Sequence, residues 1–272
     1  MPRTIPLYSE NNDFQHAEVL KRNREKRQKN KEFFVEGVKP IEQLLQHEWD
    51  ISSFLYSKDR ALSTWAKQII HSSKADSHFE LPEQLMQKLS DKEEASELIA
   101  IARMKEDSLA RISVKKDFLV VVFDRPSSPG NLGTIIRSCD ALGAAGLIIT
   151  GHAADIYDSK TIRASVGTLF SLPVIRISSP KDLLPWFEFV KATLGDLQIV
   201  GTSAKGTSDI SEQNFKKPTV LLLGNETLGL SAQYKEMSHA LVRIPINGAA
   251  SSLNVSCAAS ITLYEIQRQR RA

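Results

Sequence analysis

The stretch that decides the fold is Asp124-Arg-Pro-Ser-Ser-Pro-Gly130-Asn131-Leu-Gly133-Thr-Ile-Ile-Arg137, which follows the apolar run 118–123. Two later segments have the same order of features. They are Leu221-Leu-Leu-Gly224-Asn225-Glu226-Thr-Leu-Gly229-Leu230, and Ile244-Pro245-Ile246-Asn247-Gly248 followed by Ser251-Ser252-Leu253-Asn254-Val255-Ser256. Each runs from a predicted strand through a turn rich in Gly, Pro, Asn or Ser into a predicted helix. Strand ends and helix N-termini present unpaired backbone groups to ligands in α/β proteins. The three segments therefore predict one ligand site and an enzyme.

The regions around these segments alternate between predicted strands and helices. The strands have near-continuous apolar character, which is typical of a parallel sheet covered on both faces. We predict strands at 118–123, 146–150, 172–177, 198–202, 219–223 and 240–246, and helices near 131–142, 158–169, 181–193 and 252–269. The first hundred residues predict a smaller α/β unit, with a basic helix at 17–31, strands at 32–37, 53–57 and 98–103, and helices at 38–48 and 62–71.

The amino-acid composition limits the classes of protein to which this chain can belong. The 272 residues are 42% apolar and 25% charged, which is ordinary for a globular protein of two domains. No apolar run approaches the roughly 20 residues that span a bilayer, and the N-terminus lacks the apolar core of a secretory signal. Cys139 and Cys257 have no paired spacing, so neither a disulfide framework nor a zinc site is indicated. We expect a cytoplasmic protein with no membrane contact and no metal.

The net charge of +3 is small, but basic residues cluster near the N-terminus. One interpretation is a solvated helix face. The other is a surface that binds the phosphates of a nucleic acid, because clustered Lys and Arg gain free energy from counterion release there. The residues in question are Lys21, Arg22, Arg24, Lys26, Arg27, Lys29 and Lys31, with Glu25 alone against them.

Familiar nucleotide motifs are absent from the places where they would be informative. No G-x-G-x-x-G follows the first strand of the large sheet, and no G-x-x-x-x-G-K-[ST] or H-E-x-x-H occurs. Gly143 is expected at a helix end, where a C-cap explains it. A Rossmann-type enzyme is therefore a distant alternative.

The polar side chains of the first two segments allow two interpretations each. Asn131 is either a helix N-cap or a site residue. Arg137 lies among Ile135, Ile136 and Cys139, so we expect it to be buried against an anionic partner such as Asp140 or Glu226, or to bind a phosphate or an oxyanion. Gly224 would let a ligand approach the backbone. Glu226 would either favour a helix N-terminus or orient Arg137.

The third segment contains Ser and Asn near a predicted helix start, where either is frequently a cap. Small residues follow, which would let the last helix pack tightly. Cys139 and Cys257 are expected as small core residues rather than nucleophiles.

Taken together, the three segments resemble the signature motifs of the SpoU (TrmH-like) branch of the SPOUT RNA 2′-O-ribose methyltransferases. P-G-N-L-G-x-I-x-R matches at Pro129–Arg137, L-G-N-E-x-x-G-L at Leu223–Leu230, and I-P-x-x-G followed by S-L-N-V-S at Ile244–Ser256. Residues 161–173 also resemble a family segment. The N-terminal part resembles a small ribosomal-protein-like RNA-binding domain, best at Phe33-Phe34-Val35-Glu36-Gly37.

The resemblance implies an α/β fold whose C-terminal domain contains a deep trefoil knot. It implies a homodimer formed through that domain, with S-adenosylmethionine as cofactor and RNA as substrate. We therefore expect an RNA-binding (substrate-binding) domain over 1–106, a linker over 107–117 and a methyltransferase catalytic domain over 118–272. By position, the cofactor would contact Gly224, Ile244 and Leu253, with Thr202 nearby, and the polar site residues would be Asn131, Arg137, Glu226, Ser252 and Asn254.

The reaction implied is methyl transfer to a ribose 2′-hydroxyl, for which the enzyme must align oxygen, methyl carbon and sulfur. Arg137 would bind the RNA phosphate and stabilise the incipient alkoxide, while Asn131 and Glu226 position it. Ser252 and Asn254 would shape the pocket. RNA would be held at a distance by Lys21, Arg22, Arg24, Lys26, Arg27 and Arg163.

Other functions stay open at this point. The resemblance implies ribosomal rather than transfer RNA as substrate, because in this family catalytic domains without a fused N-terminal domain more often act on transfer RNA. One alternative is methylation of a base rather than of a ribose. Nucleoside analysis of the product distinguishes these two reactions. A non-catalytic RNA-binding or assembly factor is a further alternative, which cofactor binding without turnover would favour.

Overall fold

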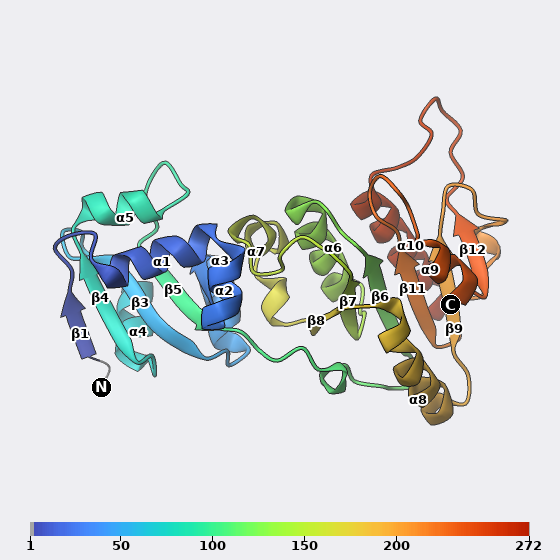
Figure 1. Cartoon of the computed structure of the whole chain (residues 1–272), viewed down its shortest axis with the longest axis horizontal. Helices are drawn as coiled ribbons and strands as arrows, with labels where there is room; N and C mark the ends of the chain where they lie inside the picture. The colour runs from blue at the N-terminus through green and yellow to red at the C-terminus, as the bar shows by residue number, and fades with distance from the viewer. Residues whose placement is uncertain (1–2, 272) are drawn as a thin grey trace. The chain divides into compact units, whose positions relative to one another are not determined.

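The computed structural model describes residues 3–271, which divide into two compact units (Figure 1). Unit 1 extends to Lys105 and also includes Tyr157–Phe170. Unit 2 consists of Glu106–Ile156 and the chain from Ser171 onward. The inclusion of 157–170 in unit 1 is not visible in the sequence pattern, which predicts only a helix there.

Unit 2 is built on a seven-stranded sheet in the order β10-β12-β9-β11-β6-β7-β8. Every neighbouring pair is parallel, as the apolar strand runs predicted. The strands are β6 (Leu119–Asp124), β7 (Gly146–Thr150), β8 (Val174–Ile177), β9 (Gln198–Thr202), β10 (Ser208–Asp209), β11 (Thr219–Leu223) and β12 (Ala240–Arg243). The last strand ends before the predicted residue 246, because Pro245 has no N–H to continue a ladder.

Helices cover this sheet on both faces. Val120, Val122 and Leu222 point to one face, where they pack with Phe187 and Tyr234. The alternate residues of the same strands are also buried. The helical elements of unit 2 are η1 (Leu109–Arg111), α6 (Pro129–Ala141), η3 (Pro180–Leu183), α8 (Leu184–Leu194), η4 (Ile210–Glu212), α9 (Ala232–Met237) and α10 (Val255–Arg271). Helices α6 and α10 pack against each other, and the Ser138 and Ser260 hydroxyls are 2.8 Å apart.

Unit 1 has a mixed five-stranded sheet in the order β1-β4-β3-β5-β2. Strand β5 is antiparallel to both of its neighbours, and the other pairs are parallel. The strands are β1 (Arg3–Pro6), β2 (Glu32–Glu36), β3 (Ile51–Ser57), β4 (Ser77–Leu81) and β5 (Leu98–Arg103). The helical elements are α1 (Asn12–Arg22), α2 (Arg24–Asn30), α3 (Val38–Gln46), α4 (Thr64–Ser72), α5 (Glu83–Leu89), α7 (Ser159–Ser165) and η2 (Thr168–Phe170). Strands β1 and β4 were not predicted.

The basic helix predicted at 17–31 is in fact two helices. Asn23 separates them in an extended conformation, and its side chain accepts a hydrogen bond from the Lys26 N–H at the start of α2. An Asn side chain competes with helical backbone bonds in this way, which favours a cap over a helix interior.

Aromatic packing explains why 157–170 belongs to unit 1. The Phe33 ring lies 4.4 Å from the Tyr157 ring, and the Trp49 ring lies 5.2 Å from the Phe170 ring, measured between centroids. The Trp49 indole N–H also donates to the Phe170 carbonyl at 2.9 Å. These contacts bury rings from both parts of the sequence in one cluster.

The predicted linker 107–117 lies inside unit 2 and is packed there. Ile112 is buried in the core, and Asp107 accepts hydrogen bonds from the Arg176 backbone N–H and Nε at 3.0 and 2.8 Å. The domain functions predicted from the sequence, and the trefoil knot that the resemblance implies, stay predictions.

Candidate functional site

The three motif segments meet at the carboxyl-end edge of the sheet of unit 2. Strand β6 lies between β11 and β7, with Phe123 opposite Leu223 and Asp124 opposite Thr150. Strand β12, which the third segment follows, is parallel to β9, and β9 is parallel to β11. Because these strands are all parallel, the chain leaves each of them at the same edge of the sheet. Asp124 is buried there, and its carboxylate accepts bonds of 2.9 Å from Arg125 Nε, Arg125 Nη2 and the Ser231 N–H.

The start of α6 is capped by Ser128 and not by Asn131. The Ser128 hydroxyl accepts a hydrogen bond from the Asn131 N–H at 3.3 Å, and Pro129 occupies the first helical turn. Proline is favoured there because its missing N–H needs no partner. The N-cap interpretation of Asn131 was therefore wrong, and its side chain is left to make contacts outside the helix.

Glu226 joins the second segment to the first. Its Oε2 accepts bonds from the Ser127 N–H and hydroxyl, both at 2.9 Å. Its Oε1 accepts from the Ser128 N–H at 3.0 Å and from Asn131 Nδ2 at 3.4 Å. The carboxylate thus lies at the N-terminal end of α6, where the helix dipole favours negative charge.

Burial alone would raise the pKa of the Glu226 carboxyl, but the Ser127 and Ser128 donors outweigh it and the pKa is lowered. A carboxyl whose pKa is lower in the folded protein adds stability above its unfolded-state pKa, and this stability is lost as pH falls through the folded pKa. We expect the stability difference between the wild type and Glu226→Gln to be largest above pH 5 and to shrink toward pH 3. Urea unfolding across pH 3–7 measures it; a difference that does not change with pH would contradict the charged network.

The second segment is held in a tight hairpin by Asn225. Its Oδ1 accepts from the Thr227 and Leu228 N–H groups at 2.9 and 3.0 Å, and its Nδ2 donates to the Arg125 carbonyl at 2.7 Å. A Cβ at Gly224 would lie 2.3 Å from the Leu230 nitrogen. The backbone of Gly229 and Leu230 therefore approaches Gly224 closely, in the way that we predicted for a ligand.

The third segment joins the first through a pair of Asn side chains. Asn254 Nδ2 donates to Asn131 Oδ1 at 3.1 Å, and Asn254 Oδ1 accepts from the Ser256 N–H at 2.8 Å. Asn254 therefore caps α10, which begins at Val255 rather than at the predicted residue 252. Ser252 is exposed beside it.

The remaining cofactor candidates lie around this edge. Thr202 ends β9, next to β11, and its hydroxyl donates to the Leu222 carbonyl at 3.1 Å. Ile244 directly follows β12, and Leu253 precedes the start of α10 with 38% of its surface exposed. In Figure 1 the loop that contains both residues projects from the body of unit 2.

Arg137 differs from the expectation of a buried, paired side chain. It is exposed on α6 and forms no hydrogen bond or ion pair with any residue in the range 3–271, so neither Asp140 nor Glu226 binds it. Six residues along an α-helix correspond to a rise of about 9 Å and a turn of about 120° away from Asn131. Within one chain, the network of Glu226, Asn131 and Asn254 does not position Arg137.

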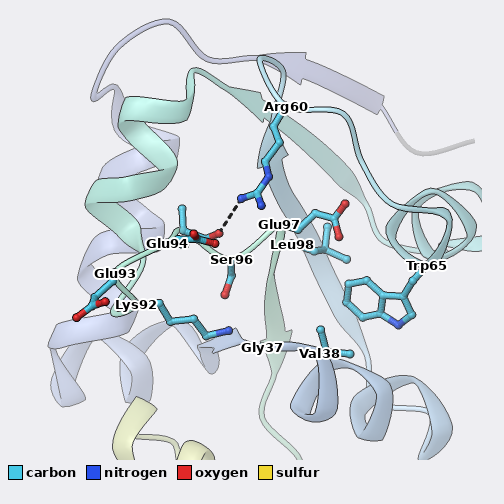
Figure 2. A pocket seen from close by; sticks show the side chains of 11 residues that line it. Gly37, Val38, Arg60, Trp65, Lys92, Glu93, Glu94, Ser96, Glu97 and Leu98 are labelled. Atoms are coloured by element: carbon cyan, nitrogen blue, oxygen red, sulfur yellow. Dashed lines mark hydrogen bonds between the residues drawn. The ribbon is translucent and has the colours of Figure 1, made fainter.

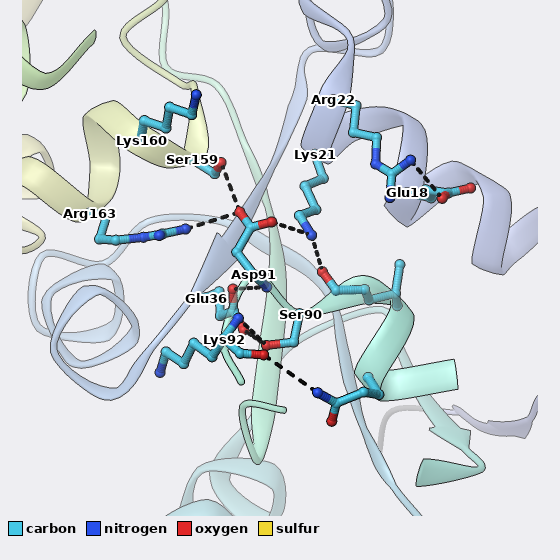
Figure 3. Close-up of polar contacts among 12 residues, drawn as sticks. Glu18, Lys21, Arg22, Glu36, Ser90, Asp91, Lys92, Ser159, Lys160 and Arg163 are labelled. Atoms are coloured by element: carbon cyan, nitrogen blue, oxygen red, sulfur yellow. Dashed lines mark hydrogen bonds and ion pairs between the residues drawn. The ribbon is translucent and has the colours of Figure 1, made fainter. Parts of the chain in front are cut away.

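The predicted RNA-binding cations of unit 1 divide into buried and exposed groups. The Lys21 ammonium is buried, donating to the Leu89 carbonyl and pairing with Asp91, each at 2.6 Å. Arg27 is also buried. Arg163 is exposed, but its guanidinium pairs with the same Asp91 at 3.0 Å (Figure 3). Arg22, Arg24 and Lys26 are exposed.

The two cysteines are free thiols in different environments. Cys139 is buried, and burial raises the pKa of its thiol. Cys257 is exposed on α10, so its prediction as a core residue was wrong. Among residues 3–271, no three His, Cys, Asp or Glu side chains gather closely enough to hold a metal ion. No helix in that range has the length and apolar character to cross a membrane.

Sequence reasoning missed the backbone supports of the site. Ser127, Ser128 and Asn225 hold Glu226 and the two turns in place, a structural role that the sequence pattern did not indicate. The Ser128-Pro129 pair was a usable signal, since a serine followed by proline is typical of a helix start.

Comparison with known proteins agrees with the motif geometry. The model of the SpoU rRNA Methylase family matches residues 118–264, and the model of the SpoU L30e-like domain matches residues 11–100. A 23S rRNA (uridine(2479)-2′-O)-methyltransferase of Streptomyces viridochromogenes is 45% identical over 270 residues, which is 99% of this chain and 94% of that protein. The 23S rRNA (guanosine(2553)-2′-O)-methyltransferase RlmP of Bacillus subtilis (strain 168) is 27% identical over 90% of this chain and 92% of its own length.

The fold agrees as well. The crystal structure of the SpoU methyltransferase AviRb from Streptomyces viridochromogenes in complex with the cofactor AdoMet superposes with a TM-score of 0.92 and 44% identity. The match covers 96% of this chain and 99% of that one. With an N-terminal L30e-like part, a C-terminal parallel α/β sheet and the three motif segments joined at its edge, the chain belongs to the SpoU rRNA methylase family.

Proposed function

We propose that this protein transfers the methyl group of S-adenosylmethionine to a ribose 2′-hydroxyl of 23S ribosomal RNA. The observation that carries the proposal is the bonded chain from Glu226 through Asn131 to Asn254, which links all three motif segments. Two relatives of nearly the same length are named as 23S rRNA 2′-O-methyltransferases, and this supports the RNA and the ribose. The first nucleotide to test is a uridine, because the 45% identical relative is named for one.

The loop before α10 fits a cofactor with many polar groups. Residues 245–253 form no hydrogen bond with the described part of the chain, and a Cβ at Gly248 would meet open space. Their backbone donors and acceptors are therefore available to a ligand. We place S-adenosylmethionine against Gly224, Ile244 and Leu253 with Thr202 nearby, where it would supply an activated methyl group on a sulfonium. A similar chain crystallised with AdoMet supports the identity of the cofactor.

The side chains of the site divide the remaining work between them. Ser252 and Asn254 would contact the target nucleotide. Asn131 and Glu226 hold Asn254 and the start of α6 in place through their hydrogen bonds. Arg137 carries a permanent positive charge and is exposed. It would bind the RNA phosphate beside the target and stabilise charge that develops on the 2′-oxygen.

We also propose a homodimer formed through unit 2. Cys257, Ile261 and Tyr264 lie at helical spacing along α10 and form an exposed stripe. Apolar stripes left uncovered on a monomer mark interaction surfaces. A second chain packed there would also bring new groups to the exposed α6–α10 region.

The double variant Ile261→Asp/Tyr264→Glu should halve the molecular mass that light scattering reports, because two charges would be buried in the interface. Phe189→Glu, at an exposed aromatic of α8, is the matched control and should leave the mass unchanged. A wild-type protein that is already monomeric would contradict the dimer.

Unit 1 would bind the RNA substrate. The exposed residues Arg22, Arg24 and Lys26 form its basic surface, and phosphate contacts of this kind position an RNA without specifying its sequence. The match of residues 11–100 to the SpoU L30e-like domain supports a substrate-binding role. We place the protein in the cytoplasm, where two free thiols stay reduced.

The test of the function is methylation of unmodified RNA with labelled S-adenosylmethionine, followed by digestion to nucleosides. Separate reactions contain 23S rRNA, 16S rRNA and transfer RNA. We expect a labelled 2′-O-methylnucleoside from 23S rRNA alone. Label in a base would overturn the ribose assignment, and label in transfer RNA would overturn the substrate. Cofactor binding without label in any RNA would favour a non-catalytic RNA-binding factor.

A further inference from the structure

Unit 1 contains a pocket of about 450 Å³ whose lining includes none of Arg22, Arg24 and Lys26. Its walls come from the start of α3, the loop after β3, helix α4 and the loop between α5 and β5 (Figure 2). The residues that carry its chemistry are Arg60, Trp65, Lys92, Ser96 and Glu97.

Ser96 gives the clearest sign that the pocket is built for a ligand. Only 8% of this residue is exposed, and its Oγ has no hydrogen-bond partner in the chain. Figure 2 shows the side chain pointing into the pocket. Buried hydroxyls are nearly always paired, because an unpaired one loses its bonds to water without compensation. A ligand that donates to or accepts from Ser96 would remove this deficit.

Two cations face the same space without acidic partners. Lys92 forms no ion pair with any described residue, and in Figure 2 its ammonium lies between Ser96 and Gly37. Arg60 donates one long bond of 3.4 Å to the Ala95 carbonyl and likewise has no ion pair in the described chain. Both groups keep their charge available to an anion.

Trp65 and Glu97 are two further residues of the pocket that could contact a ligand. The Trp65 indole is partly exposed on α4 and borders the pocket with an apolar face. The Glu97 carboxylate accepts bonds from the Ser63 N–H and hydroxyl at the start of α4, which spread its charge. The pocket thus offers a ring surface, a hydroxyl, two cations and carboxylate acceptors to one occupant.

We propose that this pocket binds one unpaired nucleotide of the substrate RNA, with its base on Trp65. Proteins recognise RNA sequence mostly at unstacked bases, which they stack on aromatic side chains and bond along the base edge. Lys92 and Arg60 would bind the phosphate, Ser96 the base edge or ribose hydroxyl, and the carboxylates any exocyclic amine. An extended peptide is a poorer occupant, because it would leave the two cations unpaired unless it were acidic.

This inference rests on the proposed function in requiring an RNA substrate, and it adds a second contact point in the unit that does not contain the motif segments. The consequence is a specific split in the kinetics. Loss of a remote base contact weakens RNA binding and raises KM, while the methyl-transfer step at saturation is unchanged when that contact is made equally in the ground and transition states.

The experiment compares Trp65→Ala, Trp65→Phe and Ser96→Ala with Tyr8→Ala, which removes an exposed aromatic of the same unit outside the pocket. Stacking on one aromatic is worth about 5- to 150-fold in affinity. We expect Trp65→Ala to raise KM for 23S rRNA within that range with kcat unchanged, and Trp65→Phe to restore most of it. Ser96→Ala should raise KM less, and Tyr8→Ala not at all. Thermal unfolding is measured for all four variants. Ser96→Ala should be as stable as the wild type or more stable, because it removes a buried hydroxyl that has no partner in the chain.

A second measurement does not depend on turnover. Trp65 fluorescence should be quenched by a single-stranded oligonucleotide of the substrate sequence, and this quenching should be absent in Trp65→Phe. Quenching without methylation of any RNA would support nucleotide binding in the pocket and overturn the proposed activity. Normal methylation with unchanged KM in Trp65→Ala would overturn the pocket and leave the activity. If Trp65→Ala binds RNA normally but binds a ribosomal protein more weakly, the pocket binds a peptide. This result would overturn the proposal that it binds a nucleotide.

Discussion

Arg137→Ala should lower kcat for methyl transfer by about 10²- to 10³-fold, which is the usual cost of removing one donor that stabilises an oxyanion. The reason is that Arg137 is the cationic member of the predicted site and has no structural partner in the described chain. Because the side chain is exposed, the free energy of unfolding should change by less than about 0.5 kcal/mol. Affinity for S-adenosylmethionine should also be unchanged.

The measurements are single-turnover methylation at saturating RNA, cofactor binding by calorimetry and urea unfolding. Arg137→Lys tests the geometry, and we expect it to recover only part of the rate because an ammonium lacks the planar fork of guanidinium. Arg271→Ala is the matched control, since it removes another exposed arginine of unit 2. A normal rate in Arg137→Ala would remove this residue from the mechanism.

Arg27→Ala should destabilise unit 1 by about 3 kcal/mol, whereas Lys26→Ala, one residue away, should have almost no effect on stability. Arg27 is only 2% exposed, and its Nη1 donates to the Leu20 and Lys21 carbonyls at 2.8 and 3.0 Å. Its Nη2 lies 3.5 Å from Asp158. Truncation would leave a cavity, two carbonyls without their donor and a carboxylate without its cation.

For RNA binding we expect the reverse: Lys26→Ala should have an effect, and Arg27→Ala should have none. Lys26 is exposed, so Lys26→Ala should reduce the slope of log K against log salt by about 1. In Arg27→Ala that is still folded, the slope should equal that of the wild type. Urea unfolding and filter binding at several salt concentrations give both quantities. A reduced slope in Arg27→Ala without loss of stability would show that Arg27 contacts RNA directly.

Much of unit 2 was predictable from local sequence. The strands β7, β9 and β11 have the predicted bounds, because buried parallel strands require continuous apolar runs that few other elements tolerate. The three motif segments were also visible, since Gly, Pro, Asn and Ser mark turns by their backbone preferences alone. That Glu226, Asn131 and Asn254 bond to one another follows only from the folded chain, because 95 and 123 residues separate the bonded pairs.

The direction in which each charged side chain points depended on tertiary packing. Lys21 and Lys26 belong to one basic run, yet Lys21 is buried on Asp91 and Lys26 is exposed. Arg137 was expected to be buried because its neighbours are apolar, yet it lies on the face of α6 that the chain leaves exposed. The sequence by itself determined the main strands of unit 2, their parallel arrangement and the family, since these depend on residue type and spacing. Tertiary structure alone decided which cations are buried and which are exposed, because burial depends on the elements that pack against each helix face.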